Sequence, residues 1–269
     1  MEFSMTLCPE TTLATGAWPL RLLTSQAVTL PSVCTLMTFA RCSVRLRASR
    51  TRRNVLEPNH TLVLGRTGSG KTIFVRRLAL NAANVACRFV FDWNDRFTYD
   101  WTGRKLPLPT CCDTAGMNRA LASRWVIYNP GREFPGCAYD RKIGLEALKH
   151  FCRYVRHTAK GGPGRKLVLI AELWMFCTED SIPAELAMLA QDGRSDGVEF
   201  VFDTQRPEKL NPSVVGAATE VVCFRLDEKQ ALRAVAGMGL DSVAVARLPL
   251  GTFTAKSVIG SEAGTDKVF

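Results

Sequence analysis

The stretch GRTGSGKT, Gly65–Thr72, carries the residue types that a phosphate-binding loop needs. It satisfies the pattern GxxxxGK[ST], and it stands between an apolar run expected to be a strand and a stretch with helical spacing. Glycines at positions 65, 68 and 70 allow backbone amides to wrap around phosphates at the start of a helix, whose dipole favours negative charge. Lys71 is expected to reach the β and γ phosphates of a nucleoside triphosphate, and the Thr72 hydroxyl to ligate Mg²⁺. The predicted nucleotide-binding residues of this loop are Gly65, Arg66, Thr67, Gly68, Ser69, Gly70, Lys71 and Thr72, of which Thr72 is also the predicted metal ligand.

Polar side chains also follow apolar runs further along the chain. Asp92 ends RFVFD and is a candidate for the nucleotide site, with a simple strand end as the alternative. Glu172 comes after the five apolar residues of LVLIA, where an acid at the end of a strand points at the phosphate loop. Asp203 and Gln205, in FDTQRP, follow another strand, although they could simply cap its end.

The elements that would position these residues alternate between strands and helices. The runs TLVLG, RFVFD, WVIYN, KLVLIAE, VEFVFD and EVVCFRL predict strands, most of them too continuously apolar to have a wet face. Between them, KTIFVRRLALNAAN, GMNRALASR, GLEALKHFCRYVRH and PAELAMLAQDGR have helical spacing, and TGRKLPLPT and KGGPGRK predict surface loops. This alternation predicts an α/β fold with a mostly parallel sheet covered by helices on both faces.

Composition separates the first part of the chain from the rest. Residues 1–54 contain no acid after Glu10 and end in the basic run RCSVRLRASRTRRN, so we predict a poorly ordered or separately folded segment. A transit sequence, a later start such as Met37 and an arm that touches nucleic acid are the alternatives, with a solvated charge run as the default. Residues 55–269 are expected to form the main domain. The formal charge of +10 favours a polyanionic partner but also suits a merely soluble basic surface.

Several classes of site find little support. The 10 cysteines are scattered without a CxxC, which favours reduced thiols over a disulfide framework. His150, Cys152 and His157 fit no standard zinc spacing. The best membrane candidate, AVTLPSVCTLMTFA, is too short to span a bilayer and is broken by Pro31, so no transmembrane segment is expected. No NKxD-like element indicates a GTPase, whereas a small-molecule kinase stays open.

The order of these motifs, continued by DGRSDGVEFVFDTQRPEKLNP, EVVCFRLDEKQALRAVAG and LPLGTFTAK, resembles the FtsK–HerA superfamily of ring-forming, DNA-pumping ATPases. Over about residues 60–256 it is most similar to the genome-packaging ATPases of phages with internal membranes and related viruses. The resemblance implies a RecA-like P-loop NTPase fold, ATP and Mg²⁺ as cofactors, and ATP hydrolysis coupled to translocation of double-stranded DNA into a preformed capsid. It also implies a homo-oligomeric ring, expected to be a hexamer, with capsid-vertex or internal-membrane proteins as further partners. Such a protein would work in the cytoplasm of the infected host cell or at the virion vertex.

The resemblance also assigns catalytic roles. Glu172 matches the acid that polarises the attacking water, and Gln205 matches the polar sensor of the γ phosphate. Arg194 looks like the arginine supplied to a neighbouring subunit, with Arg225 as a second candidate; an ordinary surface turn and a salt bridge with Asp227 or Glu228 are the respective alternatives. Ala171 stands where the family pattern usually has an Asp that holds the magnesium shell, so metal affinity is in question, and Asp92 or Asp203 could compensate.

Two other functions compete with packaging. A nucleotide-switched assembly factor with little turnover, like the filamentous-phage proteins related to zonula occludens toxin, is favoured by the missing Asp and disfavoured by the expected lack of a transmembrane segment. A cellular or conjugative DNA pump usually carries further domains, for which this chain has little room. Arg104 and Lys105, or Lys160 and Arg165, are the loop cations that would face DNA.

Overall fold

The computed structural model describes residues 59–97, 110–132, 140–257 and 264–268. All of them belong to one compact unit, assigned to Val44–Phe269. The predicted separate segment at residues 1–54 lies outside the described residues, as do Arg104 and Lys105 and nearly all of TGRKLPLPT.

The strands of the described residues form one nine-stranded sheet in the order β3-β4-β2-β5-β6-β1-β7-β8-β9. Every pairing from β3 to β7 is parallel, whereas β8 pairs antiparallel with both β7 and β9. The predicted α/β class with a mostly parallel sheet is therefore confirmed. The strands are β1 (Thr61–Leu64), β2 (Val85–Phe91), β3 (Thr110–Cys111), β4 (Trp125–Tyr128), β5 (Arg165–Ile170), β6 (Val198–Thr204), β7 (Glu220–Phe224), β8 (Thr252–Ser257) and β9 (Gly264–Lys267).

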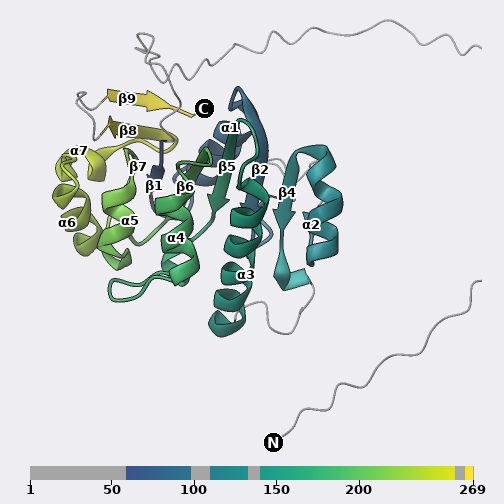
Figure 1. Ribbon diagram of the computed structural model, residues 1–269. Helices are drawn as coiled ribbons and strands as arrows, with labels where there is room; N and C mark the ends of the chain where they lie inside the picture. The colour runs from purple at the N-terminus through teal and green to yellow at the C-terminus, as the bar shows by residue number, and fades with distance from the viewer. Residues whose placement is uncertain (1–58, 98–109, 133–139, 258–263, 269) are drawn as a thin grey trace, which may run out of the picture. The chain divides into compact units, whose positions relative to one another are not determined.

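Helices cover both faces of this sheet. In Figure 1, α3 and α4 lie in front of the central strands and α1 lies behind them. The α-helices are α1 (Lys71–Asn81), α2 (Thr114–Ala120), α3 (Arg141–Ala159), α4 (Ala184–Asp192), α5 (Pro212–Ala217), α6 (Lys229–Gly237) and α7 (Ser242–Arg247). Single 3₁₀ turns are η1 (Leu121–Ser123), η2 (Pro130–Arg132), η4 (Leu173–Met175) and η5 (Pro207–Lys209). Of the described residues, no helix is long and apolar enough to cross a membrane.

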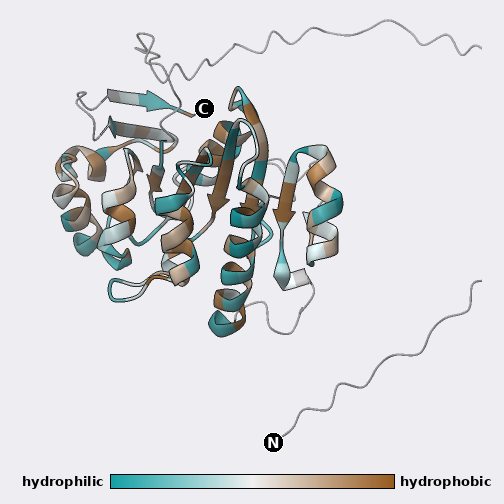
Figure 2. Cartoon of the chain, in the orientation of Figure 1, coloured by the Kyte–Doolittle hydropathy of each residue, from teal (hydrophilic) through white to brown (hydrophobic). Residues whose placement is uncertain are grey.

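The central strands are buried on both faces because their side chains alternate between two apolar clusters. On β1, Leu62 and Leu64 belong to the larger cluster, which α3 and α4 cover, and Val63 belongs to the smaller one with Phe74 of α1. Figure 2 accordingly shows the central strands as hydrophobic and the outer surface of α3 as largely hydrophilic. Continuous apolar sequence is the pattern expected for strands with helices on both sides.

All six predicted strands and all four predicted helices are present, and LPLGTFTAK contains β8. Helix boundaries differ by a few residues. The first predicted helix ends at Asn81 because Ala82 is extended, with a ψ of 112°. The second passes at Leu121 into η1, which ends where Arg124 has a φ of 61°. A left-handed backbone conformation cannot continue a right-handed helix.

Candidate active site

The loop between β1 and α1 has backbone conformations that few residues other than glycine adopt. Gly68 and Gly70 have φ angles of 76° and 101°. Gly65 is constrained by space as well, because a Cβ atom there would lie 2.7 Å from Phe224 Cβ and 2.8 Å from Ser69 Oγ. The motif therefore needs glycine at position 65 because there is no space for a Cβ atom, and at positions 68 and 70 because the backbone there is left-handed.

The loop is held on both sides by backbone hydrogen bonds. The Gly65 N–H donates to the Thr204 carbonyl at 3.3 Å, and the Arg66 N–H donates to the Arg225 carbonyl at 3.1 Å. Ser69 is buried, and no described residue forms a hydrogen bond with its Oγ atom. A buried hydroxyl without a partner is costly, and phosphate or metal-bound water at this loop would satisfy it.

Lys71 lies between two buried carboxylates at the carboxyl edge of the sheet. Its Nζ atom is 3.4 Å from Asp203 Oδ2 and 3.6 Å from Glu172 Oε1. The exposed fractions of Lys71, Glu172 and Asp203 are 3%, 2% and 2%. Charges so deeply buried persist only when they are paired, so the three side chains form one electrostatic unit.

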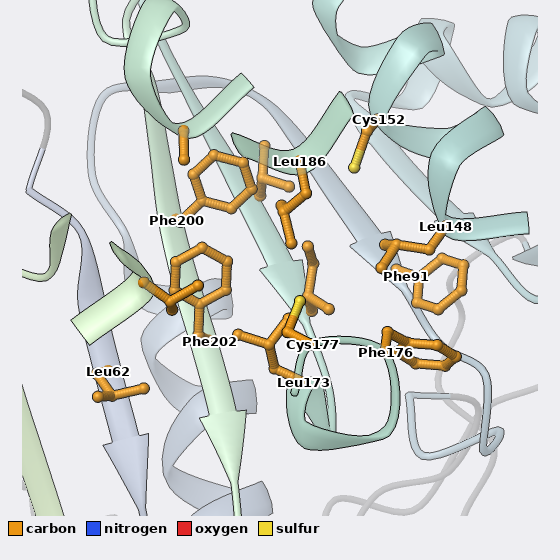
Figure 3. Close-up of a cluster of buried hydrophobic side chains, with 14 of the residues drawn as sticks. Leu62, Phe91, Leu148, Cys152, Leu173, Phe176, Cys177, Leu186, Phe200 and Phe202 are labelled. Carbon is orange, nitrogen blue, oxygen red and sulfur yellow. The ribbon is translucent and has the colours of Figure 1, made fainter. Parts of the chain in front are cut away.

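Glu172 has a strained backbone that its neighbours hold in place. Its φ of 52° is in the left-handed region, which costs a residue with a Cβ about 1–2 kcal/mol. Its N–H donates to Asp203 Oδ1 at 2.6 Å. Just beyond it, Leu173 and Phe176 pack in the buried cluster that Figure 3 shows. The hydrogen bond with Asp203 and the packing of the next residues together hold the strained backbone of Glu172 in place. Strained backbone that its surroundings hold in this way is common at functional sites.

Both carboxylate oxygens of Glu172 are occupied. Oε1 accepts hydrogen bonds from Arg96 Nη1 at 2.6 Å and from Gln205 Nε2, and Oε2 accepts one from Trp174 Nε1 at 2.8 Å. Burial acts to raise the pKa of Glu172, but the Lys71 and Arg96 cations and these hydrogen bonds outweigh it and hold the pKa below its usual range. Glu172 is therefore ionised, with three hydrogen-bond donors on its carboxylate and one acceptor position of Oε2 left open.

Gln205 connects this acid to the phosphate loop. Its side-chain oxygen accepts a hydrogen bond from Thr67 Oγ1 at 2.5 Å, while its Nε2 donates to Glu172. A side chain that contacts both Thr67 of the phosphate loop and Glu172 lies where it could contact a bound γ phosphate. The contacts support the predicted sensor role, which stays a prediction.

Asp92 organises the loop that follows β2. Its two carboxylate oxygens accept backbone N–H groups, Oδ1 from Arg96 at 2.7 Å and Oδ2 from Phe97 at 2.8 Å. Burial raises its pKa to about 6, although those two hydrogen bonds act in the opposite direction. Asp92 thereby places Arg96 for its contact with Glu172. Its described link to Glu172 runs through Arg96, and its predicted place in the nucleotide site stays a prediction.

Arg194 lies far from this cluster in the fold. It precedes β6, so it stands at the amino ends of the parallel strands, whereas Lys71 stands at their carboxyl ends. Its guanidinium contacts its own subunit: Nη2 donates to the Ala217 carbonyl at 2.7 Å, and Nε lies 3.2 Å from Nε2 of the buried His60. A role as arginine finger would require release of these contacts, and it stays a prediction.

Arg225 lies beside the phosphate loop, directly after β7. Its Nε atom donates to Asp227 Oδ1 at 2.9 Å, and Arg66 pairs with the other oxygen of the same carboxylate. The salt bridge proposed as its alternative role is therefore present. The exposed Asp227 has a pKa below its usual range because of the hydrogen bond from Arg225 and the two arginine charges.

The residues present suit Mg²⁺. Thr72 directly follows Lys71 on α1, and the carboxylate of Asp203 is close to where an acid at position 171 would stand, because Phe202 pairs with Ile170. Hydroxyl, carboxylate and phosphate oxygens are the hard ligands that Mg²⁺ prefers. Of the two candidates to compensate for Ala171, Asp203 lies beside Lys71 Nζ at 3.4 Å, whereas both Asp92 oxygens accept backbone N–H groups of the loop after β2. Compensation by Asp203 stays a prediction.

Other predicted positions have structural roles. Arg165 pairs with Glu199, and Nζ of the neighbouring Lys166 donates to the Asp196 carbonyl at 2.8 Å, both at the opposite end of the sheet. His150 Nε2 lies 2.9 Å from Thr114 Oγ1, and among the described residues no group of three or more His, Cys, Asp or Glu side chains could hold a metal. Arg96 and Trp174 are the contacts of Glu172 that sequence reasoning missed.

Comparison with known proteins gives structural but no sequence-level matches. No protein-family model matches the chain, and no curated protein matches it. The genome-packaging NTPase B204 of Sulfolobus turreted icosahedral virus 2, in complex with AMPPCP, is similar in structure, with a TM-score of 0.57 and 15% identity over 79% of this chain and 99% of that one. B204, the DNA-packaging ATPase of Sulfolobus turreted icosahedral virus, has a TM-score of 0.54 and 18% identity over 78% of this chain and 98% of that one. The chain has the RecA-like P-loop NTPase fold that these packaging ATPases share.

Proposed function

We propose that this chain is an ATPase that couples hydrolysis to translocation of double-stranded DNA, in the packaging of a viral genome into a preformed capsid. The observation that carries the proposal is the convergence of Lys71, Glu172 and Gln205 at one edge of the sheet, beside the glycine loop. These are the groups that in-line attack of water on a γ phosphate requires. The shared fold with viral packaging NTPases and the positive charge support DNA as the partner.

Each group then has a role in hydrolysis. Lys71 leaves its two carboxylates to contact the β and γ phosphates, which carry more charge. Glu172 accepts a proton from, and orients, the attacking water. Gln205 exchanges a contact with Thr67 or Glu172 for one with the γ phosphate. Bound Mg²⁺, held by Thr72 with Asp203 beside it, would neutralise charge on the phosphate oxygens.

The proposal includes a homohexameric ring in which Arg194 or Arg225 serves the neighbouring subunit's nucleotide. It also includes capsid-vertex or internal-membrane proteins as partners, and action in the host cytoplasm or at the virion vertex. An arginine supplied across a subunit boundary would couple hydrolysis to ring geometry. Light scattering with and without ATP would give the number of subunits.

Steady-state ATP hydrolysis with Mg²⁺, with and without double-stranded DNA, tests the central proposal. We expect DNA to stimulate turnover, Lys71→Ala to lose ATP affinity, and Glu172→Gln to keep ATP affinity while losing turnover. Arg153→Gln is the matched control, because Arg153 is exposed on α3 and pairs only with Glu185 among the described residues.

A second candidate is a nucleotide-switched assembly factor. It is favoured by the three protein donors on the Glu172 carboxylate, which compete with water for that side chain, and by Ala171 at the usual position of an acid. Tight ATP binding without turnover, whether or not DNA is present, would establish this alternative and exclude the translocase.

A further inference from the structure

Trp174 joins the buried acid to the surface of the molecule. It belongs to η4, directly after Glu172, and is partly exposed, whereas Leu173 on the same turn is fully buried. Its indole Nε1–H donates to Glu172 Oε2 at 2.8 Å. The other oxygen is already bound by Arg96 and Gln205. Trp174 is therefore the one described group that donates to Oε2, and it fills one of the two acceptor positions of that oxygen.

Two exposed cations lie against the ring of Trp174. The guanidinium carbon of Arg206 is 4.9 Å from the ring centroid, and Lys209 Nζ is 5.5 Å from it. Both come from the turn after β6, next to Gln205. Neither forms an ion pair with a residue that the structure describes. We call Trp174, Arg206 and Lys209 the Trp174 patch.

The chemistry of this patch fits a nucleic-acid backbone. An exposed cation–π contact is worth about 0.5–1 kcal/mol, whereas charge-assisted hydrogen bonds to phosphate are stronger. Phosphates would therefore draw Arg206 and Lys209 away from the ring. Flexible cations beside an aromatic side chain also match the way in which proteins hold nucleic acid without sequence preference. The ring, no longer covered by the two cations, would then be free to turn.

We propose that the Trp174 patch binds backbone phosphates of DNA, and that its occupation releases Glu172 Oε2 by moving the Trp174 indole. This inference rests on the proposed function, since it supplies the contact through which DNA would stimulate hydrolysis. DNA that binds the patch withdraws the two cations, Trp174 gives up its hydrogen bond, and both acceptor positions of Glu172 Oε2 then become available to orient water.

The first test compares Arg206→Gln/Lys209→Gln with Arg153→Gln/Arg156→Gln. The control pair removes the same charge from exposed positions on α3, where both arginines pair with acids of α4. Binding of a fluorescein-labelled DNA duplex is measured by anisotropy at several salt concentrations. We expect the patch variant to bind at least about tenfold more weakly and to lower the slope of log affinity against log salt by about 2, since each phosphate contact contributes about 0.9. The single variants Arg206→Gln and Lys209→Gln should each lower the slope by about 1.

The second test uses Trp174→Phe, which keeps an aromatic ring for the cations and removes the N–H donor. We expect DNA affinity to stay within about twofold of wild type, because the cations remain. Turnover without DNA should rise toward the DNA-stimulated rate, so the ratio of stimulated to unstimulated turnover falls toward one. An unchanged ratio would overturn the proposed link to Glu172.

The outcomes separate the two proposals. A wild-type protein that neither binds the duplex nor is stimulated by it would overturn the translocase and this inference together. Normal stimulation in wild type, with the patch variant behaving like the α3 control, would overturn the inference alone. The nucleotide is the other source of phosphate: a patch variant that loses affinity for an ATP analogue while binding DNA normally would assign the patch to the nucleotide and overturn the inference.

Discussion

Asp203 Oδ2 lies 3.4 Å from Lys71 Nζ, although this carboxylate comes from β6 and not from the end of β5. The family pattern usually has its acid at the position of Ala171. The second acid of the site is therefore present, on the neighbouring strand, and its other oxygen fixes the backbone of Glu172 at 2.6 Å. One side chain thus contacts both the lysine and the acid, and it is one of the two residues that the sequence named as able to compensate for Ala171.

Replacement of Asp203 should reveal this double role. We expect Asp203→Asn to lower turnover by about 10–100-fold and to raise the Mg²⁺ concentration needed for half-maximal rate. The reason is that Asn removes the negative charge near Lys71 and the metal while keeping an acceptor for the Glu172 N–H. A Mg²⁺ titration of steady-state turnover measures both. Asp192→Asn, at an exposed acid of α4 that pairs with Arg156, is the control. An unchanged Mg²⁺ requirement in Asp203→Asn would assign Asp203 a purely structural role.

Arg96 should set the acid limb of the pH profile. The Arg96 guanidinium is one of the two cations that lower the pKa of Glu172. Arg96→Gln removes that charge, so the pKa of Glu172 should rise and the fall of turnover on acidification should begin at higher pH. Turnover measured from acidic to neutral pH gives the shift. A profile that coincides with that of Arg153→Gln would contradict this prediction.

Gly65 should tolerate no side chain. In Gly65→Ala the new Cβ would meet Phe224 Cβ at 2.7 Å, on a backbone with a φ of 156°. We expect a loss of about 1–3 kcal/mol in the free energy of unfolding, typical of overpacking, together with weaker ATP binding. Gly216→Ala is the matched control, since no atom lies within 4 Å of the added Cβ on that helix. Equal stability of the two variants in urea denaturation would show that the loop relaxes freely.

Asp92 should make stability depend on pH. Its folded pKa of about 6 lies above the unfolded value, so its contribution to stability is full at low pH and is lost as the pH rises through about 6. Asp92→Asn does not titrate. The unfolding free energy of Asp92→Asn minus that of wild type should therefore increase by up to about 3 kcal/mol between about pH 4 and pH 7. Glu172 titrates with the opposite sign in both proteins and cancels in the difference, so a difference that does not vary with pH would contradict the assignment.

The sequence was sufficient to predict the buried strands, the phosphate-binding loop and the position of Glu172. Continuously apolar runs specify strands buried on both faces, and the glycine loop and Glu172 follow from strand ends that meet at one edge. It was insufficient for Arg96, because this contact with Glu172 joins residues 76 positions apart and depends on a loop whose backbone the Asp92 carboxylate helps to hold. Trp174 was missed because an aromatic residue beside a buried strand indicates core packing first.

The place of Arg194 was available from topology alone. A residue that precedes a parallel strand lies at the edge opposite to the phosphate loop, whichever motif surrounds it. Its contacts with His60 and Ala217 could not be predicted from topology, because they join the turn before β6 to residues 134 and 23 positions away in the sequence.

The position of β6 limits how such a molecule can move. This strand is hydrogen-bonded to β5 on one side and to β1 on the other, so it cannot slide without breaking both ladders at once. The sheet is consequently stiff, and in the proposed translocase movement has to take place in the segments at its edge. The turn that carries Arg206 and Lys209 is such a segment, and it begins directly after Gln205.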